Sequence, residues 1–255
     1  MHPILCQFGP LTLYSYGVML AVAFLAGTWL MQWLMRRAAQ LGAQRMLTPA
    51  QVQDLMFWVL ISAVLGARVL YILANLTYYR AHPSDVFAIW HGGLIFYGGL
   101  LTAMPTMWWY LRRARWPIGQ TLDCFVPTLA LGQAIGRIGC FLNGCCYGKP
   151  THAPWGVRLA WSDVPRHPTQ LLETAFTLLL AVVFTRWILV HRSWTAPRQG
   201  RVAAAYVLIY ATWRFLIEFL RDDNPIIALH LNLPQWVSLA LLAVAGVWLI
   251  RPQRP

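Results

Sequence analysis

The chain has 255 residues, of which 58% are hydrophobic and only 11% are charged, and its formal net charge is +12. An ordinary soluble domain carries about 25% charged residues, so this composition excludes a typical soluble globule. Positive charge is also typical of nucleic-acid binding, but arginines that flank apolar segments are better explained as membrane topology signals. We therefore expect no nucleic acid among the partners.

Apolar segments recur along the whole chain, each close to the roughly 20 residues that cross a hydrocarbon core. They predict an all-α, polytopic membrane protein with seven transmembrane helices, in which residues 1–255 form a single transmembrane domain. The N-terminal residues contain no basic region and no small-residue cleavage site, so the first segment is expected to be a retained helix. The predicted spans are residues 13–35, 52–74, 94–111, 121–142, 172–190, 202–220 and 235–250.

The arginines between the spans set the expected orientation. Arginine clusters follow the first span at residues 36–45, the third span at 112–115 and the fifth span at 186–201. By the positive-inside rule, the N-terminus then lies outside and the C-terminus lies in the cytoplasm. The longest connection, about residues 143–171, is predicted to be a structured loop that faces outward.

Three arginines fall inside predicted spans. Counted at 1.5 Å per residue from the cytoplasmic end, Arg68 and Arg137 lie roughly 24 Å deep and Arg214 lies roughly 18 Å deep. All three therefore belong to the outer half of the membrane, where a charge is costly and usually faces a partner or a water-filled cavity. Glu218 follows Arg214 by four residues and is placed to pair with it. Arg137 has no acidic neighbour on its own helix.

An arginine without an internal partner favours a fork-shaped anion such as a phosphate or a carboxylate. Tyr16 and Tyr97 lie near the outer ends of the first and third spans, at a comparable depth. The alternative is that each arginine extends to the membrane surface or is neutralised by a structural carboxylate. We interpret Arg137 and Arg214 as the residues that bind an anionic lipid headgroup.

Four short segments combine glycine, arginine and polar residues near the ends of spans. Glycine permits unusual dihedral angles and a close approach of the backbone to a ligand, so a glycine-lined helix end beside Arg137 suits a polar headgroup. In the third segment, His167, Gln170 and Glu173 supply polar groups, although a plain helix start explains this pattern equally well. The segments are HGGLIFYGGL (91–100), LGQAIGRIGCFLNGCCYG (131–148), RHPTQLLE (166–173) and RFLIEFLR (214–221).

In this order and at these spacings, the segments resemble the prolipoprotein diacylglyceryl transferase family of bacterial inner-membrane enzymes. The resemblance runs from Tyr14 to Arg221, and G-R-I-G-x-F-x-N-G around Arg137 is its most distinctive motif. It implies that a diacylglyceryl group moves from phosphatidylglycerol to the lipobox cysteine in a prolipoprotein signal peptide, with glycerol 1-phosphate released. This would be the first step of lipoprotein maturation, carried out among membrane lipids without a cofactor.

The resemblance also implies the roles of individual residues. Arg137 and Arg214 would bind and polarise the phosphate, and Glu218 would orient Arg214. A guanidinium aimed at the departing phosphate stabilises the transition state more than the ground state. The residues expected to bind substrate are Tyr16, Arg68, Asn143, Gly148, Glu218 and His167.

This chain departs from the common form of the family at three positions. Tyr97, Cys140 and Cys145 stand where the family has a histidine, an asparagine and a glutamate. An unperturbed tyrosine, with a pKa of about 10, is a poor base. We therefore expect Tyr97 to donate a hydrogen bond to the phosphate, and we leave deprotonation of the acceptor thiol to water, His91 or His167.

Cys140, Cys145 and Cys146 are close together in the sequence. Because the compartment outside the cytoplasmic membrane is oxidising, we favour a disulfide between Cys140 and either Cys145 or Cys146 over a catalytic thiol. Zinc ranks below both, since the spacing C-x4-C-C lacks the usual C-x2-C pair, and no metal is expected. Cys6 and Cys124 are expected to be inert single thiols.

Two other functions stay open at this point. The three departures allow a divergent family member that keeps the phosphatidylglycerol site but uses another acceptor. The buried arginines would also suit a transporter or flippase of an anionic lipid, although the sequence contains no internal repeat of the kind common in transporters.

Overall fold

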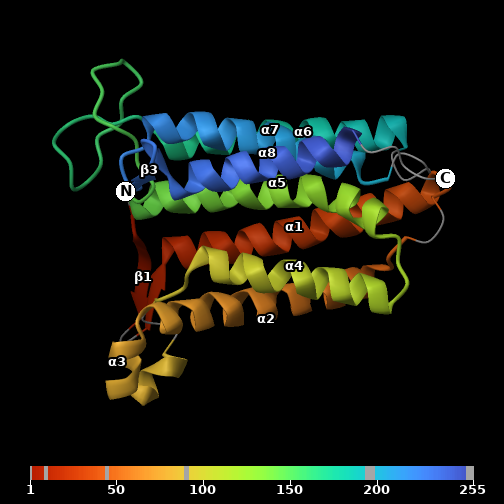
Figure 1. The fold of residues 1–255 in the computed structure, drawn as a ribbon, viewed down its shortest axis with the longest axis horizontal. Helices are drawn as coiled ribbons and strands as arrows, with labels where there is room; N and C mark the ends of the chain where they lie inside the picture. The colour runs from red at the N-terminus through yellow and green to blue at the C-terminus, as the bar shows by residue number, and fades with distance from the viewer. Residues whose placement is uncertain (1, 9–10, 44–45, 89–91, 193–198, 251–255) are drawn as a thin grey trace. The chain divides into compact units, whose positions relative to one another are not determined.

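The computed structural model describes residues 2–8, 11–43, 46–88, 92–192 and 199–250 (Figure 1). It divides the chain into two compact units, one formed by Met1–Ala43 with Gly119–Pro255 and the other by Gln44–Ile118. That residues 1–255 form a single transmembrane domain stays a prediction. The first unit contains β1 (Ile4–Phe8), β2 (Leu11–Tyr14), α1 (Ser15–Gln40), α5 (Ile118–Asn143), α6 (Thr169–His191), α7 (Arg201–Ile217), η3 (Glu218–Leu220), β3 (Ile226–Ala228), β4 (Leu231–Asn232) and α8 (Leu233–Ile250). The second contains α2 (Pro49–Ala74), α3 (Leu76–Ala81), η1 (Pro83–Phe87) and α4 (Phe96–Arg113).

Each of the seven predicted spans overlaps a long helix in the described part of the chain, namely α1, α2, α4, α5, α6, α7 or α8. Some helices extend beyond the predicted apolar segment. For example, α1 continues through Arg36 and Arg37 to Gln40, because the hydrogen bonds of a helix do not depend on the hydrocarbon around it. Helix α2 begins three residues before its predicted span, at a capping box in which the side chains of Thr48 and Gln51 each accept a hydrogen bond from the backbone nitrogen of the other residue.

Within the described part of the chain, five helical segments are long and apolar enough to cross a membrane: α1, α2, α5, α6 and Arg201–Leu220. Large apolar side chains such as Leu25, Trp29 and Leu179 are exposed along them, as expected for helices that face lipid. The prediction of a mostly helical multi-pass membrane protein is therefore confirmed. The number of seven spans and the orientation of the termini stay predictions.

Two short antiparallel hairpins were not predicted from the sequence. Strand β1 pairs with β2 directly before α1, and β3 pairs with β4 directly before α8. Each lies against the start of an apolar helix, so its hydrophobic residues merge with the helical pattern in the sequence. The fold is mostly α-helical, with two small β-hairpins.

Helix α5 runs beside α6 and α7 in the first unit (Figure 1), and hydrogen bonds hold both of them against it. The Asp123 carboxylate accepts hydrogen bonds from the backbone nitrogens of Gly200 at 2.8 Å and Ala203 at 2.9 Å. These nitrogens belong to the N-terminus of α7, where a carboxylate satisfies unpaired donors and the helix dipole. Thr174 of α6 donates a hydrogen bond to the Ala134 carbonyl of α5 at 3.3 Å. Both α6 and α7 are thus fixed against α5.

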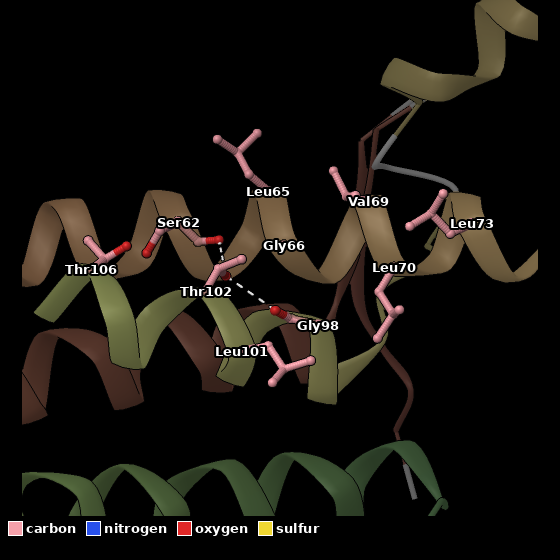
Figure 2. Close-up of a pocket in the computed structure, with 10 residues that line it drawn as sticks. All are labelled: Ser62, Leu65, Gly66, Val69, Leu70, Leu73, Gly98, Leu101, Thr102 and Thr106. Carbon is pink, nitrogen blue, oxygen red and sulfur yellow. Dashed lines mark hydrogen bonds between the residues drawn. The ribbon is translucent and has the colours of Figure 1, made fainter. Parts of the chain in front are cut away.

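In the second unit, glycines allow α2 and α4 to approach closely. A Cβ atom at Gly98 would lie 2.4 Å from the Gly66 carbonyl oxygen, and one at Gly66 would lie 2.2 Å from Thr102 Oγ1. Thr102 donates a hydrogen bond to the Ser62 carbonyl at 2.6 Å across the same contact. Figure 2 shows these residues beside a shallow groove whose walls are mostly apolar.

We predict that Gly98→Ala lowers the thermal unfolding temperature of the detergent-purified protein. The added methyl group would collide with backbone, and overpacking of this kind costs about 1–3 kcal/mol. Gly246→Ala in α8 is the control, because a Cβ there meets no atom of the described residues within 4 Å. Equal unfolding temperatures for Gly98→Ala and Gly246→Ala would contradict the close packing of α2 against α4.

Candidate active site

The Glu173 carboxylate lies at the centre of an arginine cluster in the first unit. Glu173 is in the second turn of α6, and its side chain is 1% exposed. Its Oε2 atom lies 2.8 Å from Arg137 Nε on α5, and its Oε1 atom lies 2.8 Å from Arg214 Nη1 on α7. Arg221, which follows η3, approaches Oε2 to 3.5 Å through Nη1. One carboxylate therefore joins guanidiniums from three parts of the chain.

A second buried carboxylate, Glu218, supports the same cluster. Its Oε2 atom lies 2.9 Å from Arg214 Nη2, and its Oε1 atom lies 3.5 Å from Arg221 Nε. Asn224 donates a hydrogen bond to Oε1 as well. The pairing of Arg214 with Glu218, predicted from their spacing of four residues, is confirmed.

At the edge of the cluster, Asp223 accepts two hydrogen bonds from Arg221, at 2.9 Å from Nε and 2.6 Å from Nη2. The Asp223 side chain is 20% exposed, whereas that of Arg221 is 4% exposed. Arg221 is thus held by its own carboxylate in a bidentate pair, the geometry that guanidinium prefers. Arg137 is held differently, because Glu173, its closest carboxylate in the described part of the chain, is shared with Arg214.

The structure corrects the expectation that Arg137 lacks an acidic partner. Its partner, Glu173, belongs to α6, so the spacing of residues along α5 could not predict this contact. The sequence did contain one signal, since Glu173 is an acidic residue inside a predicted span, where charge is usually functional or paired. From the sequence, Glu173 was expected only to be a polar residue near a helix start, and Arg221 only to end the segment that begins at Arg214.

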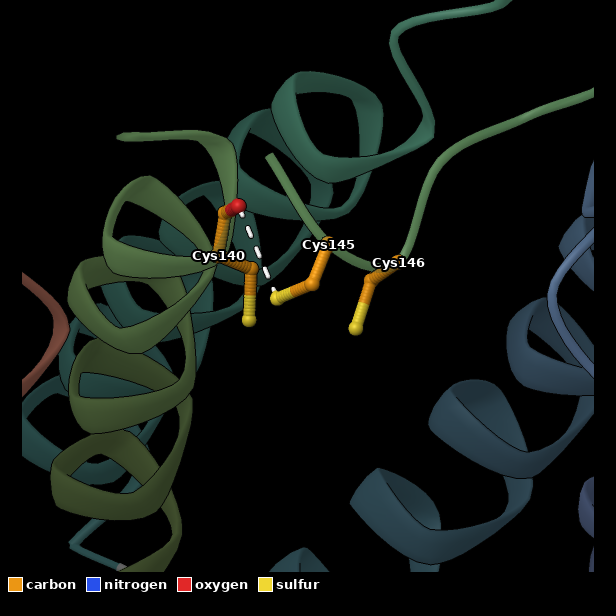
Figure 3. A group of neighbouring side chains, drawn as sticks. All are labelled: Cys140, Cys145 and Cys146. Atoms are coloured by element: carbon orange, nitrogen blue, oxygen red, sulfur yellow. Dashed lines mark hydrogen bonds between the residues drawn. The ribbon is translucent and has the colours of Figure 1, made fainter. Parts of the chain in front are cut away.

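Three thiols lie next to this cluster. Cys140 is in the last turn of α5, Cys145 and Cys146 follow the helix, and the three sulfur atoms all lie within 4.8 Å of one another. Figure 3 shows the three side chains converging on one space. The pKa of the Cys146 thiol is lowered because Cys140 and Cys145 hydrogen-bond to it, and Arg221 and Arg137 also attract its thiolate form. The thiols and the arginines are therefore electrostatically coupled.

All three cysteines are free thiols in the structure, so the disulfide considered from the sequence is not formed here. Cys6 and Cys124 are free as well. Because disulfide formation depends on the redox conditions, the bond between Cys140 and Cys145 or Cys146 stays a prediction.

The start of α6 fixes the backbone that carries two of the thiols. Thr169 Oγ1 donates a hydrogen bond to the Cys146 carbonyl at 2.9 Å, and Gln170 Nε2 donates one to the Cys145 carbonyl at 2.7 Å. Cys146 itself has a positive φ of 63°, a conformation that needs such external support in a residue other than glycine. The first two turns of α6 thus hold both the thiols and, through Glu173, the arginines.

Other predicted site residues of the first unit surround these groups. Tyr16 on α1 lies against Gly139 of α5, where a Cβ atom would be 3.3 Å from the tyrosine ring, and it interacts electrostatically with Arg137 and the thiols. Asn143 ends α5 and contacts the Cys145 thiol. Both residues are brought to the cluster, while their role in substrate binding stays a prediction.

Gly148 and His167 join the loop after α5 to the chain around Arg221. The Gly148 nitrogen donates a hydrogen bond to the His167 carbonyl at 3.1 Å, and Gly148 forms a β-bridge with Arg221. A Cβ atom at Gly148 would lie 2.5 Å from the His167 carbonyl oxygen. Glycine is therefore required for this close approach. The His167 side chain contacts Trp155, with 3.3 Å between His167 Nδ1 and Trp155 Nε1.

Arg68 belongs to the second unit and has a different environment from the one expected. Its Nε and Nη2 atoms donate to the carbonyls of Val86 at 2.9 Å and Asp85 at 2.5 Å. Its Nη1 atom donates to the carbonyls of Gly92 at 2.9 Å and Gly93 at 3.1 Å. Among the described residues, four backbone carbonyls therefore satisfy this guanidinium.

Tyr97 is the second residue of α4 in the same unit and is half-buried. Its proposed hydrogen bond to the substrate phosphate, and a substrate-binding role for Arg68, stay predictions. His91, one of the groups considered for deprotonation of the acceptor, lies outside the described residues.

Comparison with known proteins identifies the family. The family model described as prolipoprotein diacylglyceryl transferase matches residues 3–251. The chain belongs to this family. The resemblance inferred from the four segments is therefore confirmed over nearly the whole chain.

Curated relatives agree, and each is named phosphatidylglycerol–prolipoprotein diacylglyceryl transferase. One from Nitratidesulfovibrio vulgaris strain Miyazaki F is 36% identical over 265 residues, which cover 100% of this chain and 94% of the relative. One from Bordetella parapertussis is 34% identical and covers 100% of this chain and 97% of the relative. One from Methylococcus capsulatus is 36% identical and covers 87% of this chain and 82% of the relative.

In this member of the prolipoprotein diacylglyceryl transferase family, we predict that Glu173→Gln strongly lowers the thermal unfolding temperature. Removing one partner from a buried ion pair costs about 3–5 kcal/mol, and here the arginines that share Glu173 would lose their common counter-charge. Thermal unfolding in detergent measures the effect. Asp54→Asn is the matched carboxylate-to-amide control, since Asp54 makes an exposed hydrogen bond with Tyr110. Loss of stability in the control but not in Glu173→Gln would contradict the central role of Glu173.

Proposed function

We propose that this chain transfers the diacylglyceryl group of phosphatidylglycerol to the lipobox cysteine of prolipoproteins and releases glycerol 1-phosphate. Family membership and the names of its relatives support the activity. The arginine cluster supports the site, with Arg137 and Arg214 as the groups that bind the phosphate. Phosphatidylglycerol and a prolipoprotein signal peptide are then the two substrates, and nucleic acid is not a partner.

The observation that carries this proposal is that Arg137 and Arg214 share the Glu173 carboxylate. Arg214 also contacts Glu218, whereas the Arg137 guanidinium has only its share of Glu173 among the described carboxylates, so Arg137 attracts a further anion most strongly. The planar fork of a guanidinium suits phosphate oxygens. The two side chains are 19% and 14% exposed, so a ligand can reach them, whereas Arg221 is 4% exposed and bound to Asp223. The phosphate of phosphatidylglycerol carries the single negative charge that this side of the cluster accommodates.

The same arrangement favours the reaction. The acceptor thiolate attacks the glyceryl carbon, a carbon–sulfur bond forms, and the carbon–oxygen bond to the phosphate breaks with its electron pair on the leaving oxygen. The phosphate gains a second negative charge in this step. Arginines held rigidly by Glu173 and Glu218 stabilise that charge more than the single charge of the bound lipid, which lowers the barrier.

The remaining site residues have supporting roles in this proposal. Tyr16, Asn143, Gly148 and His167 line the pocket, and Tyr97 donates a hydrogen bond to the phosphate. The protein lies in the bacterial inner membrane with seven spans, its N-terminus outside and the loop of residues 143–171 facing outward. Arginine clusters on one side of the predicted spans support this orientation, which puts the site in the outer half of the membrane.

The activity is tested with proteoliposomes that contain the full-length protein, phosphatidylglycerol and a lipobox peptide. We predict that mass spectrometry detects the diacylglyceryl thioether of the peptide. Arg137→Ala and Arg214→Ala are expected to lower the rate by about 10²–10³-fold, the usual effect of removing a group that stabilises developing charge. Arg137→Lys keeps the charge but not the planar fork of the guanidinium, so its conversion rate is expected to be higher than that of Arg137→Ala and lower than that of the wild type.

Arg37→Ala is the matched control, because Arg37 is exposed near the other end of α1, roughly 30 Å along the helix from Tyr16. Its rate is expected to equal that of the wild type. Unchanged conversion by Arg137→Ala would overturn the phosphate role. No thioether with the wild type would overturn the proposed function, and lipid movement across the bilayer without chemistry would indicate a transporter.

A further inference from the structure

Cys140, Cys145 and Cys146 form the only group of three or more potential metal-ligating side chains found among the described residues. The group contains no histidine, aspartate or glutamate, and Cys140 is buried while the other two are half-buried. Three sulfur ligands that lie within 4.8 Å of one another suit a soft cation. Neither the family model nor the names of the relatives mention a metal.

We propose that these three thiolates bind one Zn²⁺ ion, and that its fourth coordination position takes the thiolate of the acceptor cysteine. The first part stands on the geometry of the thiols alone. The second part rests on the proposed function.

The distances fit such a site. Zinc binds thiolate sulfur at about 2.3 Å, so two sulfurs of a tetrahedral site lie about 3.8 Å apart. The three sulfurs are within 4.8 Å of one another, so shifts of about 1 Å or less close them around an ion. The spacing C-x4-C-C argued against zinc in the sequence. The structure answers this objection, because the chain reverses after α5 and the Cys145 nitrogen donates to the Cys140 carbonyl at 3.1 Å.

The surroundings keep the ligands in place. The Cys145 and Cys146 carbonyls are held by Gln170 and Thr169 at the start of α6. Neighbouring hydrogen bonds of this kind orient metal ligands and raise the affinity of a site. The loop that carries the thiols is therefore organised before any ion binds.

Charge also favours the ion at this position. Three thiolates and Zn²⁺ together carry one negative charge, and the positively charged Arg137 and Arg221 guanidiniums lie nearby. A site with three protein ligands leaves a fourth position for a substrate or water, as in catalytic zinc sites, whereas structural sites have four protein ligands. The site therefore lies near Arg137, one of the two arginines that bind the phosphate in the proposed function.

The consequence for the reaction is an activated acceptor. A thiol that coordinates zinc loses its proton, so the acceptor cysteine releases H⁺ to solvent and binds as a thiolate. Its sulfur then supplies the electron pair for the new carbon–sulfur bond, while the carbon–oxygen bond breaks and its electron pair leaves with glycerol 1-phosphate. Zinc is neither oxidised nor reduced, and it returns to its three-thiolate state when the thioether leaves.

Cobalt(II) is the probe for the site, since it replaces zinc and gives visible absorption and thiolate charge-transfer bands. The full-length protein is purified in detergent, reduced and freed of metal, and titrated with Co²⁺. We expect one equivalent to bind with thiolate charge-transfer bands, and zinc to displace it. Cys145→Ser with Cys146→Ser is expected to weaken Co²⁺ binding at least tenfold, while the matched control Cys6→Ser binds like the wild type.

The lipobox peptide is then added to the cobalt-loaded protein. We expect the visible spectrum to change with the cysteine peptide and not with the same peptide carrying serine. Absence of thiolate bands in the reduced wild type would overturn the metal site, whether or not the double variant folds. An unchanged spectrum with the cysteine peptide would overturn the acceptor position.

These outcomes separate the two proposals. If the metal-free wild type converts the peptide at the full rate, the acceptor position on zinc fails, while the proposed function stands and the Co²⁺ titration alone decides the metal site. If the thiolate bands form but no thioether appears with zinc-loaded protein, the proposed function fails and the metal site stands.

Discussion

The Glu173 carboxylate is the interaction on which the rest of the site depends. Without it, guanidiniums on α5, on α7 and after η3 would repel one another in an environment where water cannot screen them. With it, Arg137 and Arg214 are held on either side of one carboxylate at 2.8 Å. The residues just before Glu173 hold the Cys145 and Cys146 backbone through Thr169 and Gln170, so the first two turns of α6 organise both halves of the site.

This arrangement explains how a strongly apolar chain tolerates so much charge in one place. Arg221 has Asp223 and a share of Glu218, and Arg214 has Glu218 and a share of Glu173, while Arg137 has only its share of Glu173. Three carboxylates match the three arginines in number, but the weakest pairing lies on the side of the cluster that includes Arg137, next to the thiols. The proposed transfer joins a sulfur nucleophile to a glyceryl carbon whose leaving group is a phosphate, and the protein groups suited to the sulfur and to the phosphate are neighbours.

Sequence reasoning predicted the features that depend on spacing within one helix. It found the positions of the long helices, the limits of the loop between Asn143 and Thr169, and the pair of Arg214 with Glu218, because each follows from hydropathy or helical periodicity. It missed the contact of Glu173 with Arg137, which joins two helices whose packing is set by the whole fold. It also missed that loop carbonyls enclose Arg68, and that a chain reversal brings three cysteines together, since neither leaves a periodic pattern.

The central claim is that the cluster around Glu173 holds the phosphate of an anionic lipid, and lipid retention tests it most directly. Native mass spectrometry of the detergent-purified protein, incubated with equal amounts of phosphatidylglycerol and zwitterionic phosphatidylethanolamine, reports which lipid stays bound. We predict preferential retention of phosphatidylglycerol by the wild type and by Arg37→Ala, and loss of that preference in Arg137→Ala. Equal retention of the two lipids by the wild type, or an unchanged preference in Arg137→Ala, would contradict it.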